Sequence, residues 1–150
     1  MLQLGNPAPD FELLNDQGQL IQLRKVLKKG PLLLYFYPAD FTPGCTKEAC
    51  DFRDQFPNVQ EKNIQIFGIS PQKVETHAKF RKHLNLPFDL LSDPQKNIIR
   101  AYGAEGPFGL GVRRITYLIG QDGLIKDCIK ADFRISKHKN FLEKVLSAQN

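Results

Sequence analysis

The residues of this chain whose types and spacing could do chemistry lie between Pro38 and Cys50. This segment follows an apolar run over residues 32–37, which is typical of a buried strand. From Cys45 onward, apolar residues recur at steps of four, three and four, which predicts a helix. Cys45 is therefore expected in the first turn of that helix, where backbone N–H groups and the helix dipole stabilise an anion. Because the thiolate is the nucleophilic form of cysteine, this placement predicts a reactive thiol.

The elements that must position this thiol alternate between strands and helices. Turn residues around Gly18 and around residues 120–123 each predict a hairpin, and Ser70 is expected to cap a helix that opens with Pro71. The expected strands cover residues 11–14, 19–23, 32–37, 64–70, 88–91, 113–119 and 124–130. The expected helices cover residues 42–60, 70–84 and 93–103, with a last helix capped by Ser136.

This order of elements predicts an α/β protein with a mixed central β-sheet flanked by helices. A cysteine at the start of the first long helix makes the arrangement resemble a thioredoxin-like fold, here with an N-terminal β-hairpin extension. No repeat, low-complexity tract or linker divides the chain, so residues 1–150 are expected to form a single domain. The Cys-x-x-Cys motif of disulfide reductases is absent, because four residues separate Cys45 and Cys50.

The composition is that of a globular chain, with 41% hydrophobic and 25% charged residues. No apolar stretch approaches the roughly 20 residues that span a bilayer, and the N-terminal segment shows no secretory signal. Three cysteines are too few for a secreted disulfide scaffold, so we expect a cytoplasmic protein. The net charge of +5 is spread along the chain without an aromatic-plus-basic motif. We therefore expect solvated surface charge and no nucleic-acid or membrane partner.

The motif Pro38-x-x-x-Thr42-x-x-Cys45 resembles the active-site motif of the peroxiredoxins. The run Thr-Pro-Gly-Cys-Thr, with Cys50 five residues after Cys45, is similar to the bacterioferritin comigratory protein (Q-type) subfamily. Further segments match in the same order along nearly the whole chain: Gly5-x-x-Ala8-Pro9-x-Phe11-x-Leu13, Asp16-x-x-Gly18, Tyr35-Phe36-Tyr37-Pro38, Phe67-Gly68-Ile69-Ser70, Leu91-Ser92-Asp93 and Arg114-Ile-Thr-Tyr-Leu-Ile119. An ordered set of this kind is more specific than one short motif.

The resemblance implies a role for each residue of the motif. Cys45 would be the peroxidatic nucleophile, which attacks a peroxide oxygen and becomes a sulfenic acid. Arg114 would face both the sulfur and the substrate oxygen and stabilise charge on the departing oxygen. The Thr42 hydroxyl would bond to the substrate and the thiolate, a role compatible with that of a helix N-cap, and Pro38 would shield the pocket from water. Glu48 would either orient the arginine or be an ordinary surface charge.

Cys50 would be the resolving cysteine, again by resemblance. A five-residue step turns an ideal helix by about 140° and advances it by about 7.5 Å, which leaves the two Cα atoms roughly 8–9 Å apart. A disulfide tolerates at most about 7 Å between its Cα atoms. We therefore predict that the first helix unwinds locally before Cys50 attacks the sulfenic acid. The alternative is that Cys50 is an inert buried thiol.

Taken together, the resemblance implies a thiol-dependent peroxidase that reduces hydrogen peroxide and organic hydroperoxides. It would cycle through an intramolecular Cys45–Cys50 disulfide that a thioredoxin-like protein reductant restores, and it would act as a monomer without a cofactor. Two alternatives remain open. A disulfide exchange protein would keep Cys45 but would not need Thr42 or Arg114, and a basic binding module would use its cysteines only structurally.

Several other residues are expected to take no part in the chemistry. Cys128 sits in a strand-like stretch outside any motif, and Arg113 should be a surface charge on the sheet face opposite Arg114. The glycine-rich stretch at residues 103–111 lacks the Lys-Ser/Thr ending of a phosphate loop, so we expect a mobile loop that borders the pocket.

The three histidines, His77, His83 and His138, show no metal-ligand spacing and are expected on the surface. Metal, flavin and nicotinamide signatures are missing from the sequence as well.

Overall fold

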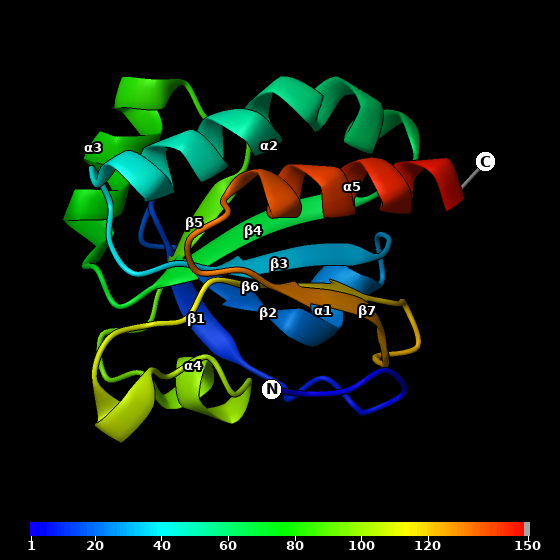
Figure 1. Cartoon of the computed structure of the whole chain (residues 1–150), viewed down its shortest axis with the longest axis horizontal. Helices are drawn as coiled ribbons and strands as arrows, with labels where there is room; N and C mark the ends of the chain where they lie inside the picture. Colours follow the sequence, from blue (N-terminus) through cyan, green and yellow to red (C-terminus); the bar gives the residue numbers. More distant parts are fainter. Residues whose placement is uncertain (149–150) are drawn as a thin grey trace.

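The computed structural model describes residues 1–148, in which seven strands form one sheet in the order β2-β1-β5-β4-β3-β6-β7 (Figure 1). The strands are β1 (Glu12–Asn15), β2 (Leu20–Gln22), β3 (Leu32–Phe36), β4 (Gln65–Ser70), β5 (Asp89–Ser92), β6 (Ile115–Ile119) and β7 (Ile125–Lys130). The helices are α1 (Leu23–Leu27), α2 (Pro43–Glu61), α3 (Val74–Leu84), α4 (Asn97–Ala101) and α5 (Ser136–Ala148), with a 3-10 turn η1 at Pro107–Gly109. Strand β3 pairs in parallel with β4 and antiparallel with β6, so the sheet is mixed, as expected.

Strand β3 lies at the centre of two hydrophobic cores, one on each face of the sheet. Because successive side chains of a strand point to opposite faces, Leu33 and Tyr35 join the core under α2, α3 and α5. Leu32, Leu34 and Phe36 join the core on the other face, which includes residues of α1 and α4. All five side chains of β3 are buried. Burial on both faces explains why this strand is a continuous apolar run in the sequence.

The segment from Pro38 to Cys50 begins shortly after β3 and continues into helix α2. The residue before the helix, Thr42, has extended backbone angles, and Pro43 occupies the first turn, where its missing N–H costs nothing. Ala49 and Phe52 are completely buried on the side of α2 that faces the sheet core. Helix α2 runs beside α5, and the two cover the same face of the sheet (Figure 1).

The two predicted hairpins are confirmed, since β1 pairs antiparallel with β2 and β6 pairs antiparallel with β7. The predicted start of the second long helix is wrong. Ser70 is the last residue of β4 and pairs with Ser92 of β5, while its hydroxyl accepts the backbone N–H of Gln72. Helix α3 therefore begins only at Val74. The second strand of the first hairpin likewise ends at Gln22, because α1 begins at the next residue.

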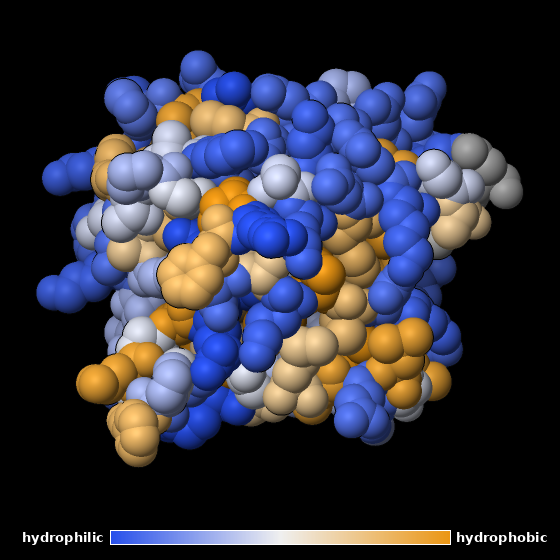
Figure 2. All heavy atoms as spheres, viewed as in Figure 1, coloured by the Kyte–Doolittle hydropathy of each residue, from blue (hydrophilic) through white to orange (hydrophobic). Residues whose placement is uncertain are grey.

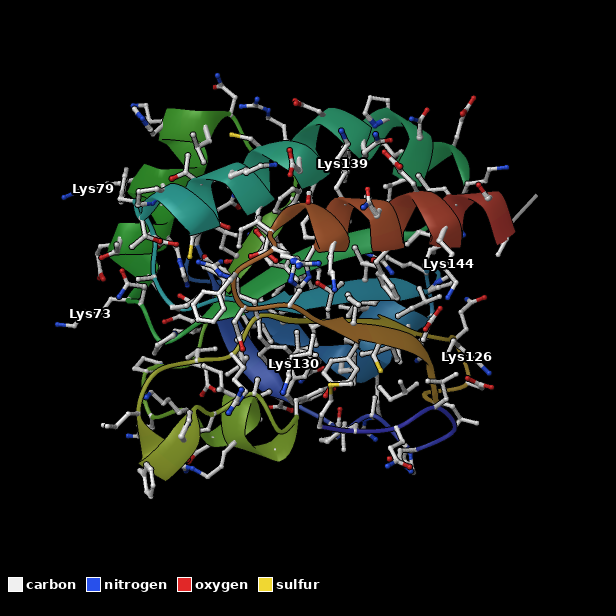
Figure 3. All side chains as sticks on the ribbon, viewed as in Figure 1. Lys73, Lys79, Lys126, Lys130, Lys139 and Lys144 are labelled. Atoms are coloured by element: carbon white, nitrogen blue, oxygen red, sulfur yellow. The ribbon has the colours of Figure 1, made fainter. Side chains whose placement is uncertain are left out.

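Positive charge is dispersed over the surface. The lysines labelled in Figure 3 come from the start and body of α3, from β7 and from α5: Lys73, Lys79, Lys126, Lys130, Lys139 and Lys144. Two of them bind carboxylates, with 2.6 Å from Lys126 to Asp122 and 3.0 Å from Lys144 to Asp127. Within residues 1–148, no helix is long and apolar enough to cross a membrane.

Candidate active site

Cys45 lies in the first turn of α2, where the sequence places it, and is 1% exposed. Its side chain belongs to the core that also contains Tyr35 and Tyr37 of the central strand region. Cys50 lies on the same continuous helix, is half-buried and packs against that core. Both thiols are free. The structure therefore represents the dithiol form with α2 folded.

Thr42 precedes the helix but does not cap it with its side chain. The hydroxyl Oγ1 donates to the carbonyl oxygen of Ala39 at 2.9 Å, and no helix N–H is bound by this side chain. A hydroxyl that has given its hydrogen to a carbonyl keeps its lone pairs as acceptors. Thr42 is thus available to accept a hydrogen bond next to the first turn of α2.

Arg114 reaches the first turn of α2 from the residue before β6, although it lies far from α2 in the sequence. Its backbone N–H donates to Asp132 Oδ1 at 2.9 Å, and its Nη1 donates to Glu48 Oε1 at 3.0 Å. Its Nη2 packs so closely on Gly44 that a Cβ added there would lie 2.8 Å away. The guanidinium is therefore held between the residue that precedes Cys45 and the carboxyl one turn after it.

Glu48 is completely buried and is not an ordinary surface charge. Desolvation raises the pKa of this carboxyl to about 8, and the opposing attraction of Arg114 offsets this only in part. The carboxyl is thus the partner that orients the arginine, the first of the two roles that the sequence left open for Glu48.

Pro38 and Arg114 line a common hollow of about 560 Å³ on the surface. The loop between α4 and β6 borders it through Gly106 and Gly111, which confirms that the glycine-rich stretch borders a pocket. Much of the remaining wall is apolar, from Pro107, Leu110, Val112 and Phe133. Figure 2 shows apolar side chains exposed at the lower left, over the loop between α4 and β6. The hollow thus combines the arginine with a largely apolar rim, and Cys45 and Thr42 are not part of its lining.

The AhpC/TSA family model matches residues 4–128, which is most of the chain. The chain belongs to the AhpC/TSA family. Peroxiredoxin Bcp of Bacillus subtilis is 42% identical to it over 133 residues, which cover 84% of this chain and 84% of that protein.

Solved structures of peroxiredoxins superpose on almost the whole chain. The crystal structure of peroxidoxin BcpB from Mycobacterium tuberculosis has 36% sequence identity and a TM-score of 0.92, covering 99% of this chain and 98% of that one. The bacterioferritin comigratory protein of Xanthomonas campestris, studied for its alkyl peroxide reduction activity, has 27% identity and a TM-score of 0.86, covering 99% and 97%. The thioredoxin-like fold and the membership in the Bcp and peroxiredoxin Q group are confirmed. The chain is an enzyme that reduces peroxide with a thiol.

The structure corrects the expectation for two histidines of this peroxiredoxin. His77 is completely buried and His138 is 1% exposed, whereas His83 lies on the surface as expected. Each buried histidine binds polar partners from distant elements, which allows a polar ring to be buried. The signal in the sequence was spacing: His77 precedes Phe80 by three residues and His138 precedes Phe141 by three, so each lies on the apolar side of its helix.

Two further expectations concern Arg113 and Cys128. Arg113 lines the same hollow as Arg114, so its expected position on the opposite sheet face is wrong, whereas its side chain is 34% exposed and pairs with Asp132. The alternation of a strand does not apply, because both arginines precede β6. Cys128 packs against the core on the sheet face opposite Cys45, and burial raises the pKa of its thiol. This location does not favour a reaction of Cys128 with Cys45.

The described part of the chain, residues 1–148, contains no group of three or more His, Cys, Asp or Glu side chains arranged to hold a metal ion.

Proposed function

We propose that Cys45 is the peroxidatic cysteine of this enzyme. Its thiolate attacks the terminal oxygen of a hydroperoxide, the S–O bond forms as the O–O bond breaks, and hydroxide or alkoxide leaves. The observation that carries the proposal is the approach of the Arg114 guanidinium to Gly44, the residue before Cys45. A fixed positive charge at this point stabilises the thiolate and the charge that develops on the departing oxygen.

Thr42 and Pro38 complete the proposed substrate site. The Thr42 hydroxyl has given its hydrogen to Ala39, so it can accept the O–H of an incoming hydroperoxide. Pro38 has no N–H to compete for that oxygen and stands in the wall of the hollow. The apolar rim of this hollow supports organic hydroperoxides as substrates besides hydrogen peroxide, in line with the activity of the Xanthomonas relative.

Cys50 is the proposed resolving cysteine. Its thiolate attacks the sulfur of the Cys45 sulfenic acid, a disulfide forms, and the hydroxyl group leaves and takes up a proton to become water. Both cysteines lie in the folded helix α2, where ideal geometry separates their Cα atoms by roughly 8–9 Å. The first turns of α2 must therefore unwind before the disulfide can form. A thioredoxin-like protein would then reduce the disulfide, in a monomeric enzyme of the reducing cytoplasm.

Peroxide consumption coupled to thioredoxin oxidation tests these assignments. We expect Cys45→Ser to abolish turnover, because no sulfenic acid can form. We expect Cys50→Ser to consume about one equivalent of peroxide and then stop, because its sulfenic acid has no resolving thiol. Cys128→Ser is the matched control and should turn over normally.

Three results would overturn the assignments. Normal turnover in Cys45→Ser would refute Cys45 as the nucleophile. Normal thioredoxin-linked turnover in Cys50→Ser would refute its resolving role. If Cys128→Ser instead stopped after about one equivalent of peroxide, that role would belong to Cys128.

A further inference from the structure

A buried histidine lies behind the arginine of the active site. His138, in the first turns of α5, has its Nε2 2.9 Å from the carbonyl oxygen of Ala131. A carbonyl can only accept, so Nε2 carries a hydrogen. The other ring nitrogen, Nδ1, lies 2.7 Å from Thr116 Oγ1 on β6 and 3.5 Å from Glu48 Oε2 on α2. The proton on Nδ1 is therefore the variable one.

The surroundings of Nδ1 satisfy His138 in either protonation state. Nδ1 of a neutral ring has one lone pair, so it accepts either from the Thr116 hydroxyl or from a protonated Glu48. In a charged ring Nδ1 donates, and the Thr116 oxygen can accept. Glu48 Oε2, by contrast, is buried without a hydrogen-bond partner among the described residues, since 3.5 Å to Nδ1 exceeds hydrogen-bond length. A buried polar atom without a partner is costly, and a small movement of the carboxyl toward Nδ1 would remove that cost.

The electrostatics of the two groups favour one shared proton. Burial raises the pKa of Glu48 to about 8, and burial also lowers the pKa of His138, so each group favours its uncharged form. The charged and titratable groups that act on this pair come from several elements. They are Arg114 before β6, Asp132 after β7, Asp51 on α2 and Tyr35 on β3.

We propose that His138 is a positioning residue for the peroxidase reaction, because its Nδ1 shares one proton with Glu48 Oε2 and so sets the charge of the carboxyl that holds Arg114. When Glu48 keeps the proton, it still accepts from Arg114 Nη1 but leaves the positive charge of the guanidinium uncompensated. When Glu48 is ionised, the ion pair offsets that charge. The kinetic consequence rests on the proposed role of Arg114 at Cys45. The shared proton itself does not.

Two substitutions separate the two ring nitrogens. His138→Gln offers an amide N–H where Nε2 stands and no acceptor where Nδ1 stands. His138→Asn offers an acceptor where Nδ1 stands, since its amide oxygen takes the place of that nitrogen, and no donor where Nε2 stands. We expect His138→Gln to lower the pH at which Glu48 ionises by about one unit, the value of one lost hydrogen bond, and His138→Asn to leave it close to wild type.

The direct readout is the infrared band of a protonated carboxyl, assigned to Glu48 by its loss in Glu48→Gln and followed against pH. In the wild-type protein with labelled histidine, the Nδ1 resonance of His138 should change at the same pH as this band. Because this resonance is followed in the wild-type protein, the comparison does not depend on the folding of a His138 variant. The exposed His83→Gln is the matched control and should leave the band unchanged.

The kinetic readout is the single-turnover oxidation of Cys45 by hydrogen peroxide in a Cys50→Ser background. In His138→Gln we expect the pH profile of this oxidation rate to shift together with the Glu48 band. At a pH where Glu48 is ionised in the variant but protonated in the parent protein, the rate should fall on the order of tenfold. The proposal would be overturned if Glu48 ionised at the same pH in the Gln and Asn variants. It would also be overturned if the Nδ1 resonance of His138 did not change at the pH where Glu48 ionises. A wild-type protein that does not oxidise Cys45 would refute the proposed function instead, and the infrared result would still stand.

Discussion

Glu48 shows how a single buried residue couples the active site to stability. The folded carboxyl has a pKa of about 8 against an ordinary value of 4.5, chiefly because of burial and in spite of Arg114. Below pH 4.5 both folded and unfolded chains hold the proton, and the native state has its full stability from this group. Between about 4.5 and 8 only the native state still binds it, so stability falls as the pH rises through this window.

Glu48→Gln should remove this part of the pH dependence, because an amide does not titrate and its oxygen still accepts from Arg114. In the wild type, the native state holds one proton more than the unfolded state in this window. The free energy of unfolding therefore falls by up to about 1.4 kcal/mol for each unit of rising pH. Urea unfolding at several pH values between 5 and 8 measures the slope in both proteins. Glu143→Gln, which changes an exposed glutamate of α5, is the control and should keep the wild-type slope. An unchanged slope in Glu48→Gln would show that the buried carboxyl is already ionised.

At the scale of elements, a buried polar network fixes the loop that joins β3 to α2. Tyr37 donates from its hydroxyl to Asp40 Oδ1 at 2.6 Å, and His77 of α3 lies 2.7 Å from Asp40 Oδ2 through Nδ1. The other ring nitrogen of His77 lies 3.1 Å from the carbonyl oxygen of Leu91 on β5. The ring of His77 thus pairs with the Asp40 carboxyl group and connects it to β5. Helix α3 and strand β5 thereby hold the loop that carries Pro38 and Thr42.

Removing one member of this pair should be strongly destabilising, because it leaves the other buried without its partner. We expect Asp40→Asn and His77→Gln each to lower the free energy of unfolding by about 3–5 kcal/mol. Because the two residues are in contact, the double variant should lose less than the sum of the two. Chemical denaturation of the three variants and the wild type measures the coupling. Strict additivity would contradict the pair.

For the molecule as a whole, the sequence predicted what local patterns determine. The apolar run predicted β3, the turn residues predicted both hairpins, and the spacing after the strand placed Cys45 in the first turn of α2. Contacts between distant elements were beyond these local patterns, and the approach of Arg114 to α2 was expected only from the family resemblance. The spacing of His138 on α5 marks its side as apolar, but only the packing of α5 beside α2 brings the ring to Glu48. The start of α3 was mispredicted for a related reason, since the ladder between β4 and β5 extends to Ser70.

The same packing links the redox state of the cysteines to the integrity of one core. Cys45 is 1% exposed and contributes to the core between α2 and the sheet, together with Ala49. The two cysteines cannot join across a regular helix, because their Cα atoms stand farther apart than a disulfide allows. After one equivalent of peroxide, we therefore expect the amides of the first turns of α2 to lose protection from hydrogen exchange. Amides of β4 and β3, in the middle of the sheet, should keep their protection in both forms.

Hydrogen exchange followed by mass spectrometry on the dithiol and the oxidised protein measures this difference. The Cys50→Ser variant is the control: its Cys45 can be oxidised but cannot form the internal disulfide, so α2 should stay protected. Loss of protection in this control as well would assign the opening of α2 to the sulfenic acid itself. Equal protection of α2 in the dithiol and oxidised wild type would contradict the unwinding. Cys50 would then not be the thiol that reacts with Cys45, because an intact helix keeps the two apart.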